Sequence, residues 1–313
     1  MMRKKISPFA HPVYRPLLAL VCALLWGSAA TFIKLGYAQL QVNTGDTASQ
    51  LLFAGCRFTL AGLLTLLIFS LVEKRVLKPT DPASWTRIAA LASTQTVLQY
   101  FSFYIGVAHT TGTTSAIING CNPFLTILAA IYIFRGEKMS RDKAIGCLFG
   151  LAAVLLMNYS GLKQGLQFTV FGEGFLFLSM AGNISSTNLA KRYSAVDDPV
   201  MLSGYQFVCG GLILALLGFL LGGRLHFNAM ALLILLWLAM VSAVAYSFWS
   251  LLLKYNEVSR IAIYNSLTPV FGLFFSAVFL KETAQAFHPL TLLSLALVSG
   301  GIIIINRRKG THI

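Results

Sequence analysis

The chain has 313 residues, of which 57% are hydrophobic and only 11% are charged. Because soluble domains carry about 25% charged residues, this composition excludes an ordinary soluble fold and indicates an integral membrane protein. The formal net charge of +14 would suit a nucleic-acid binder only if the basic residues formed a face on a soluble domain, and here they lie between hydrophobic runs. We therefore expect a lipid bilayer as partner and no nucleic acid.

Ten runs of mostly apolar residues follow one another, each close to the length of about 20 residues that a helix needs to cross a bilayer. They lie at 17–37, 48–72, 87–107, 113–134, 143–159, 170–190, 199–222, 229–253, 260–280 and 288–306. The sequence therefore predicts an all-α polytopic membrane protein with ten transmembrane helices. The start of the chain also resembles a signal peptide, but its apolar run continues past Ala30 to Lys34, so we expect it to remain as the first span.

The basic residues indicate which side of the membrane each loop faces. Most of the 24 Lys and Arg residues lie at the chain ends and in alternate loops, and the few on the other side are Lys34, Lys163, Arg224 and Lys281. Because cytoplasmic loops are enriched in Lys and Arg, we expect both termini in the cytoplasm. Residues 1–16 and 307–313 are then cytoplasmic tails.

Two motifs recur in the same order along the chain. The pattern Ala-Ile-x-Asn-x-x-x-Pro occurs at 116–123 and again at 262–269. Earlier in each half, the segment 55–62 matches the segment 204–211 at two glycines and one phenylalanine. The recurrence indicates that the chain consists of two halves with the same fold.

Each half holds five of the ten spans. We expect a first repeat at 17–159, with helices 1 to 5, and a second repeat at 170–306, with helices 6 to 10. Because the number of spans per repeat is odd, the second repeat enters the bilayer from the opposite side. Such inverted repeats are typical of secondary transporters, whose substrate site lies between the repeats near the bilayer midplane.

The repeated Asn and Pro residues put polar groups at the depth of the lipid. Pro123 and Pro269 lack an N–H group and so release the carbonyl groups of Asn119 and Asn265, which predicts a helix break at each proline. An unsatisfied polar group there costs several kcal/mol unless it faces protein or water. We expect both asparagines to line a shared central path, with interhelical packing as the alternative; their duplication in inverted halves favours the path.

Other polar and aromatic side chains follow single faces of the predicted helices. Residues three or four positions apart share a face, and such stripes are found in the third, sixth and eighth spans. Each could line a cavity or hold neighbouring helices together, and Trp26 could stack on a substrate or fill the core. The candidates for substrate binding are Trp26, Gln95, Gln99, Asn119, Asn122, Asn183, Tyr246, Trp249 and Asn265.

Arg57 is a cation about 14 Å inside the second span, too deep to reach water easily. It could bind a substrate carboxylate or phosphate, or it could anchor neighbouring helices, which we favour. No Asp or Glu lies in the middle of a span. We therefore expect passive or exchange transport, with Glu173 as the main candidate if protons are coupled.

The sequence carries no enzyme signature. The five cysteines lie within apolar runs and read as small buried side chains, and the five histidines lack metal-ligand spacing. Nucleophile, phosphate-binding and zinc-protease motifs are missing as well. We expect no catalytic residues, no metal, no cofactor and no enzymatic activity.

The motifs together resemble the EamA family of the drug/metabolite transporter superfamily. The residues that carry the resemblance are Trp26-Gly27, Lys34, Arg57-Phe58, Pro123 with Gly136-Glu137, and Pro269 with Lys281-Glu282. Gln206 departs from the pattern, because the second repeat of the family commonly has Arg there. The resemblance implies ten helices around a central substrate cavity. Glu137 and Glu282 follow their helices at opposite faces of the membrane, where we expect them to cap or to pair with Lys and Arg rather than carry protons.

The same resemblance implies a function and a location. It indicates a multi-pass protein of the bacterial cytoplasmic (inner) membrane that exports amino acids or related small metabolites by alternating access. An organic-anion, phosphate-sugar or drug carrier of the same superfamily is the alternative within transport. A membrane receptor or scaffold is the alternative outside it, and the short loops count against that class.

Small-residue motifs bear on the oligomeric state. Gly146-x-x-x-Gly150 and Gly218-x-x-x-Gly222 allow two helices to approach closely. The contact could lie within the bundle, which we favour, or across a dimer. We therefore expect a monomer or a homodimer.

Overall fold

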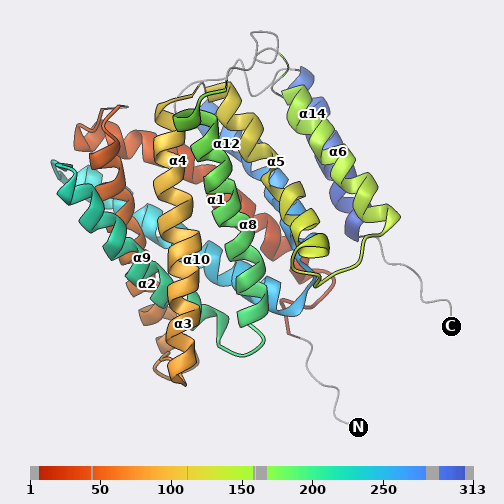
Figure 1. Ribbon diagram of the computed structural model, residues 1–313, viewed down its shortest axis with the longest axis horizontal. Helices are drawn as coiled ribbons and strands as arrows, with labels where there is room; N and C mark the ends of the chain where they lie inside the picture. Colours follow the sequence, from red (N-terminus) through yellow and green to blue (C-terminus); the bar gives the residue numbers. More distant parts are fainter. Residues whose placement is uncertain are drawn as a thin grey trace.

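The computed structural model describes residues 7–43, 45–110, 112–157, 159, 168–279 and 289–306. Within these ranges every regular element is a helix, and the helices form one bundle (Figure 1). The predicted Lys281-Glu282 pair lies outside the described residues. The predicted all-α polytopic membrane fold is confirmed.

The first half holds five spans. The third is composite, because a π-helical segment separates two α-helices. The elements are α1 (Tyr14–Leu40), α2 (Thr47–Glu73), α3 (Pro82–Leu91), the π-helix η1 (Ala92–Leu98), α4 (Gln99–Ala108), α5 (Gly112–Tyr132) and α6 (Arg141–Met157).

The second half also holds five spans, of which the sixth and ninth are composite. Its elements are the π-helix η2 (Val170–Gly174), α8 (Phe175–Tyr193), α9 (Pro199–Leu220), α10 (Ala229–Tyr255), α11 (Val258–Ala262), the 3-10 helix η3 (Ile263–Leu267), α12 (Thr268–Phe279) and α14 (Pro289–Asn306). Among the described residues, five stretches are individually long and apolar enough to cross a membrane: Tyr14–Leu40, Thr47–Glu73, Pro199–Leu220, Ala229–Tyr255 and Val258–Phe279.

Several helices begin at a short polar side chain that the local sequence supplies. The carboxylates of Asp46 and Asp81 accept hydrogen bonds from the backbone N–H groups three residues later, at 3.0 and 2.8 Å. Asp198 and Asn228 cap α9 and α10 in the same manner. Because these caps satisfy N–H groups that a helix start leaves without partners, they fix where each span starts.

The helix contacts between the two halves come in equivalent pairs: each main contact has a counterpart when every helix is replaced by the matching helix of the other half. Helix α1 packs against α10 and α12, and its counterpart α8 packs against α4 and α5. Helix α2 packs against its own counterpart α9, and α6 packs against α14, which Figure 1 shows at one edge of the bundle. These are the pairings expected when the first five spans are superposed on the last five in inverted orientation.

Glycines bring the backbones of α2 and α9 into direct contact. A Cβ atom on Gly55 would lie 2.2 Å from the Ala215 nitrogen, and one on Gly62 would lie 2.5 Å from the Gly204 oxygen. On the other helix, a Cβ on Gly211 would lie 2.4 Å from the Thr59 nitrogen. The repeated segments 55–62 and 204–211 are therefore the two sides of one interface between the halves.

The small-residue motifs are used inside the bundle. A Cβ on Gly146 would lie 2.4 Å from Ile305 Cγ1 of α14, and one on Gly150 would meet the Phe124 ring of α5 at 2.1 Å. Gly218 likewise faces α2, where its Cβ would lie 2.4 Å from the Leu52 nitrogen. These three glycines serve helix contacts within one chain.

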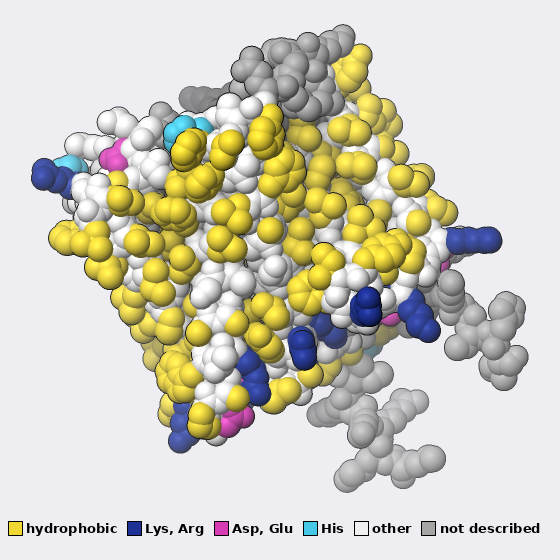
Figure 2. Space-filling model, viewed as in Figure 1, with side chains coloured by type: hydrophobic (Ala, Val, Ile, Leu, Met, Phe, Trp, Pro, Cys, Tyr) yellow, Lys and Arg dark blue, Asp and Glu magenta, His cyan; other side chains and the backbone are white. Residues whose placement is uncertain are grey.

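The described ends of the chain lie on one side of the bundle. Arg15 Nη2, near the start of α1, donates to Asn306 Oδ1, at the end of α14, over 3.2 Å. We call this the terminal side. Figure 2 shows apolar side chains over the middle of the visible face and most of the visible Lys and Arg side chains along the lower edge. This distribution suits a protein whose middle contacts lipid.

Candidate functional site

Four aromatic rings meet at the centre of the interface between the halves. Phe58 of α2 and Phe207 of α9 stack, with centroids 5.2 Å apart and an interplanar angle of 18°. Tyr100 of α4 lies 4.4 Å from Phe58, and Tyr246 of α10 lies 4.8 Å from Phe207. The two tyrosine hydroxyls share a hydrogen bond of 2.8 Å. Both halves thus contribute equally to this aromatic centre.

The aromatic centre lies on the pseudo-two-fold axis that relates the two halves. Phe58 and Phe207 occupy matching positions of the repeated segments at 55–62 and 204–211. Tyr100 and Tyr246 are separated by the same spacing as Asn119 and Asn265. Since each ring contacts its own counterpart, the pseudo-two-fold axis passes between them. Tyr246 was a predicted candidate; Tyr100 was not, although the repeat spacing applied to Tyr246 identifies it.

Equivalent polar contacts flank the aromatic centre. Arg57 donates from Nε and Nη2 to Ser242 Oγ at 3.2 and 2.9 Å. At the matching positions of the other half, Thr96 Oγ1 donates to Gln206 Oε1 at 2.6 Å. Helix α2 approaches from the side opposite the termini and α9 from the terminal side. The Arg57 cation therefore lies toward the side opposite the termini, and the neutral Gln206 amide lies toward the terminal side.

Arg57 is 3% exposed and lies in an aromatic environment. Its guanidinium carbon is 4.9 Å from the centroid of the Phe58 ring. In the part of the chain that the structure describes, Arg57 forms no ion pair. It is a buried charge held by neutral groups.

Trp26 extends the aromatic centre toward α1. Its ring makes edge contacts with Tyr246 and Trp249, with centroids 5.0 and 4.9 Å apart. The indole N–H is buried and has no acceptor among the described residues. Three of the predicted candidates are thus brought together, and they present one unused donor.

Three further candidates form a chain of amide hydrogen bonds. Asn122 Nδ2 of α5 donates to Asn183 Oδ1 of α8 at 2.8 Å, and Asn183 Nδ2 donates to Gln99 Oε1 of α4 at 3.2 Å. The other oxygen in reach, Asn122 Oδ1, is buried without a described partner. The amides link three helices around one line of polar groups.

Replacing Asn183 with alanine is expected to lower the free energy of unfolding by about 1–2 kcal/mol, because it leaves the partly buried amides of Asn122 and Gln99 without their partner. Unfolding of the purified protein in detergent measures the change. Asn188→Ala is the matched control, since the Asn188 amide bonds only the Ile184 carbonyl of its own helix. Equal losses in the two variants would contradict an interhelical role for Asn183.

The repeated asparagines bond within their own spans. Asn119 Nδ2 donates to the Ser115 carbonyl at 2.8 Å, and Asn265 Oδ1 accepts from Thr268 Oγ1 at 3.0 Å. Helix α5 continues through Pro123 as an α-helix, so the helix break predicted at Pro123 is wrong. The 3-10 helix η3 directly precedes α12, in which Pro269 lies. A path along these asparagines stays a prediction.

Gln95 lies on the terminal side of the aromatic centre. It lines a small cavity with Gln206, Ser203 and Ser250, and the two serine hydroxyls share a hydrogen bond of 2.8 Å. These groups are all neutral. They give the terminal side of the centre an uncharged polar lining.

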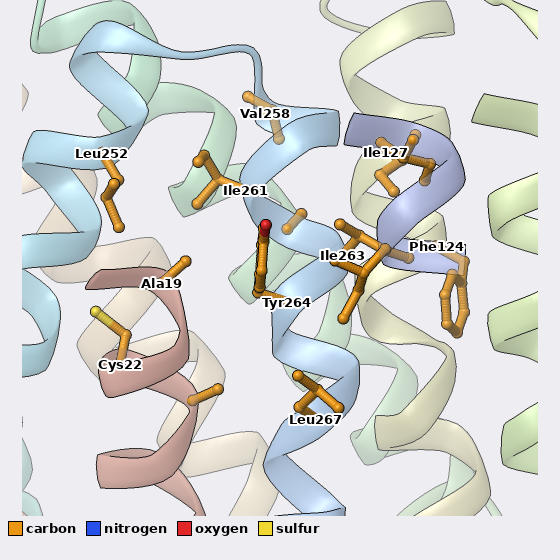
Figure 3. Packing of buried hydrophobic residues seen from close by; sticks show 14 of the residues in the cluster. Ala19, Cys22, Phe124, Ile127, Leu252, Val258, Ile261, Ile263, Tyr264 and Leu267 are labelled. Atoms are coloured by element: carbon orange, nitrogen blue, oxygen red, sulfur yellow. The ribbon is translucent and has the colours of Figure 1, made fainter. Parts of the chain in front are cut away.

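Apolar residues close the bundle between this region and the terminal side. The cluster joins the last turns of α5 and α10, the first turns of α1, and the α11–η3 segment. Figure 3 shows Ala19, Cys22, Phe124, Ile127, Leu252, Val258, Ile261, Ile263, Tyr264 and Leu267 packed together. We call this set the apolar plug. Its side chains are buried, pack against one another and come from both halves.

The two halves also match one known family separately. The EamA-like transporter family matches residues 15–159 and again residues 170–307. The chain belongs to the EamA-like transporter family. Members of this family are membrane transporters of the drug/metabolite transporter superfamily, so the bundle is a transporter with two EamA repeats.

Individual relatives agree with the family. A protein of Bacillus subtilis, described as the uncharacterized transporter YetK, is 25% identical over 82% of this chain and 78% of its own. A chloroplastic WAT1-related protein of Arabidopsis thaliana is 26% identical over 91% of this chain and 67% of its own. A solved crystal structure superposes with a TM-score of 0.72 at 18% identity, over 92% of this chain and 94% of that one. The last likeness concerns the fold alone.

The acidic residue that follows the fourth EamA span ties the halves together. Glu137 Oε2 accepts from Lys143 Nζ at 2.8 Å, and Glu137 Oε1 accepts from the Ser259 backbone N–H at 3.2 Å. Its side chain is only 5% exposed. Glu137 thus both pairs with a lysine and caps the start of α11, at the edge of the apolar plug.

Glu173 satisfies the groups around it at the start of the sixth EamA span. Its carboxylate accepts from the Thr110 hydroxyl and, at 2.7 and 3.0 Å, from the backbone N–H and hydroxyl of Thr169. The side chain is buried. It therefore fastens η2 to the end of α4 on the side opposite the termini.

Proposed function

We propose that this membrane transporter exports amino acids or related small metabolites across the bacterial cytoplasmic membrane, with both chain termini in the cytoplasm. It works by alternating access between the repeats at 17–159 and 170–306. The observation that carries the proposal is the aromatic centre, which lies at the junction of the two inverted halves and is flanked by polar groups from both.

The closed terminal side supports alternating access. In the proposed orientation, the apolar plug and the contact of Glu137 with α11 block the cytoplasmic route to the aromatic centre. Helix α5 meets the ninth span through α11 and η3, while α12 packs against α1. If each half adopted the conformation of the other, these contacts would break and the equivalent contacts would form at the opposite face of the membrane. The aromatic centre would then be open to the cytoplasm.

The chemistry of the centre suits a small polar solute with an apolar body. Trp26, Tyr246 and Trp249 offer ring faces and edges, and the Gln99, Asn122 and Asn183 amides offer both donors and acceptors. A zwitterionic amino acid needs such a mixture, because its two charges require donors and acceptors close together. Among the described residues, no carboxylate lies near the aromatic centre. Because proton-coupled carriers use acidic residues within the membrane as relays, this favours exchange over proton coupling.

Counterflow into proteoliposomes tests the proposal. Vesicles loaded with one unlabelled compound receive the same compound in labelled form, and the set contains leucine, threonine and glucose 6-phosphate. We expect saturable counterflow of an amino acid. Tyr246→Ala should slow it by about tenfold or more, because the variant removes ring contacts to Trp26 and Phe207. Leu71→Ala, an exposed position at the end of α2, is the control and should leave the rate unchanged.

The alternatives predict other outcomes. Counterflow of the sugar phosphate but of neither amino acid would replace the proposal with an organic-anion carrier. Counterflow of no compound by folded protein would favour a receptor or scaffold. An unchanged rate in Tyr246→Ala would place the route away from the aromatic centre.

A further inference from the structure

We propose that Arg57 binds a carboxylate group of the transported solute, and that it does so from the side of the aromatic centre opposite the termini. The inference rests on the proposed function, since it names the chemical class that the same site accepts. The site combines Arg57 with the Phe58 ring, whose centroid lies 4.9 Å from the guanidinium carbon, and with Tyr100, whose ring lies 4.4 Å from that of Phe58.

The guanidinium has more donors than the protein uses. Arginine presents five N–H groups in a planar fork, and only Nε and Nη2 donate here, both to Ser242 Oγ. No described carboxylate lies within ion-pair distance of Arg57. A buried charge without a counter-ion costs several kcal/mol, and the Nη1 edge of the fork matches the two oxygens of a carboxylate. An anionic ligand would supply both the missing charge and the missing acceptors.

The surrounding side chains favour an anion over a neutral ligand. Tyrosine hydroxyls can donate to a carboxylate as readily as they accept from one another. Tyr100 lies on α4 with its ring 4.4 Å from the Phe58 ring, which in turn faces the Arg57 guanidinium. The low dielectric of the buried site strengthens every one of these interactions.

The second repeat argues against a purely structural role for the charge. Gln206 matches Arg57 by position, and its contact with Thr96 matches the contact of Arg57 with Ser242. The neutral amide thus maintains the same helix contact at 2.6 Å. Because a neutral glutamine makes this helix contact in the second repeat, the contact itself does not require a positive charge in the first repeat.

The asymmetry has a consequence for the transport cycle. A carboxylate meets a cation when it approaches from the Arg57 side and a neutral amide when it approaches from the Gln206 side. The site therefore binds carboxylates with different strength from the two faces of the membrane. Arg57→Gln, which copies the residue of the second repeat, should remove both the anion preference and this difference.

The first test is competition in the counterflow assay. Unlabelled leucine and leucinamide, in which a neutral carboxamide replaces the carboxylate, compete with the labelled amino acid. In the wild type we expect leucinamide to compete at least thirtyfold more weakly, roughly the effect of leaving a buried charge without its partner. In Arg57→Gln the two competitors should become nearly equal.

Ser242→Ala is the matched variant that separates the two roles. It removes the helix contact of Arg57 but keeps the charge, so preference for the carboxylate should persist. If Arg57 served only as an anchor, Ser242→Ala and Arg57→Gln would change transport alike, and neither would alter the ratio of the two competitors. That result would overturn the proposal.

A second test is independent of transport. Purified wild-type protein in detergent is heated with 4-methylpentanoate or with 4-methylpentanamide, which differ only in the acid group. We expect the carboxylate alone to raise the melting temperature, and Arg57→Gln to abolish that rise. Equal shifts with both compounds would refute carboxylate binding. A shift specific to the carboxylate, without counterflow of any amino acid, would retain the anion site while rejecting the proposed function.

Discussion

Gly55→Ala is expected to destabilise the protein by about 3 kcal/mol or more, the upper range for inserting an atom into a packed interior. The added Cβ would lie 2.2 Å from the Ala215 nitrogen and 2.5 Å from its Cα. Both are backbone atoms, so no side-chain rotation relieves the overlap and the helices must move apart. Separation of α2 from α9 would also pull the stacked Phe58 and Phe207 rings apart.

Thermal unfolding in detergent and the yield of monodisperse protein measure this effect. Gly45→Ala is the control, because a Cβ there meets nothing within 4 Å. We expect the control to unfold like the wild type and Gly55→Ala to yield little folded protein. The milder reciprocal variant Gly204→Ala would meet the flexible end of Leu66 at 2.6 Å and should cost less. Equal stability of Gly55→Ala and Gly45→Ala would contradict the close backbone contact.

Glu137→Gln is expected to lower the free energy of unfolding by about 3 kcal/mol, as found when one member of a buried ion pair is removed. The Lys143 side chain is 9% exposed, so its charge would keep only the partly exposed Glu257, at 3.3 Å, as a described counter-ion. The bond to the Ser259 N–H would also weaken. In the proposed transport cycle these Glu137 contacts hold the terminal side closed, so we expect the variant to shift the protein toward the state that is open on the terminal side.

A double-mutant cycle with Lys143→Met isolates the pair. We expect the double variant to lose clearly less than the sum of the two single variants, because either change alone removes the interaction. Glu257→Gln is the control, since that side chain is 48% exposed and its pairs contribute little. Additive losses in the cycle would mean that Glu137 acts only as a helix cap.

The spans and the repeat were predictable from the sequence for clear reasons. Bilayer thickness sets the length of each apolar run, so ten runs could be counted without knowing any contact. The repeat is visible in Gly and Phe because both halves use these residues at the contact of α2 with α9. The role of Glu137 was also predictable, since an acidic residue directly after a span has few partners other than helix starts and nearby lysines.

The hydrogen-bond partners of the polar side chains were harder to predict from the sequence. An asparagine in a helix can bond its own preceding turn or another helix, and the choice depends on rotamers and neighbours. Asn119 takes the first route and Asn122 the second, only three residues later. Likewise, the π-helix η1 shifts the register of the third span after Leu91, so the faces that carry Gln95 and Gln99 could not be placed from regular helical spacing.

The contact of α2 with α9 has a consequence for the order of assembly during synthesis. Helix α2 enters the membrane long before α9 is made, so its glycine face has no permanent neighbour while the intervening spans are inserted. The glycine face of α2, where the backbone is exposed, contacts lipid until α9 is inserted. The first five spans therefore cannot reach their native packing alone, because α2 needs the seventh span and α6 needs the tenth.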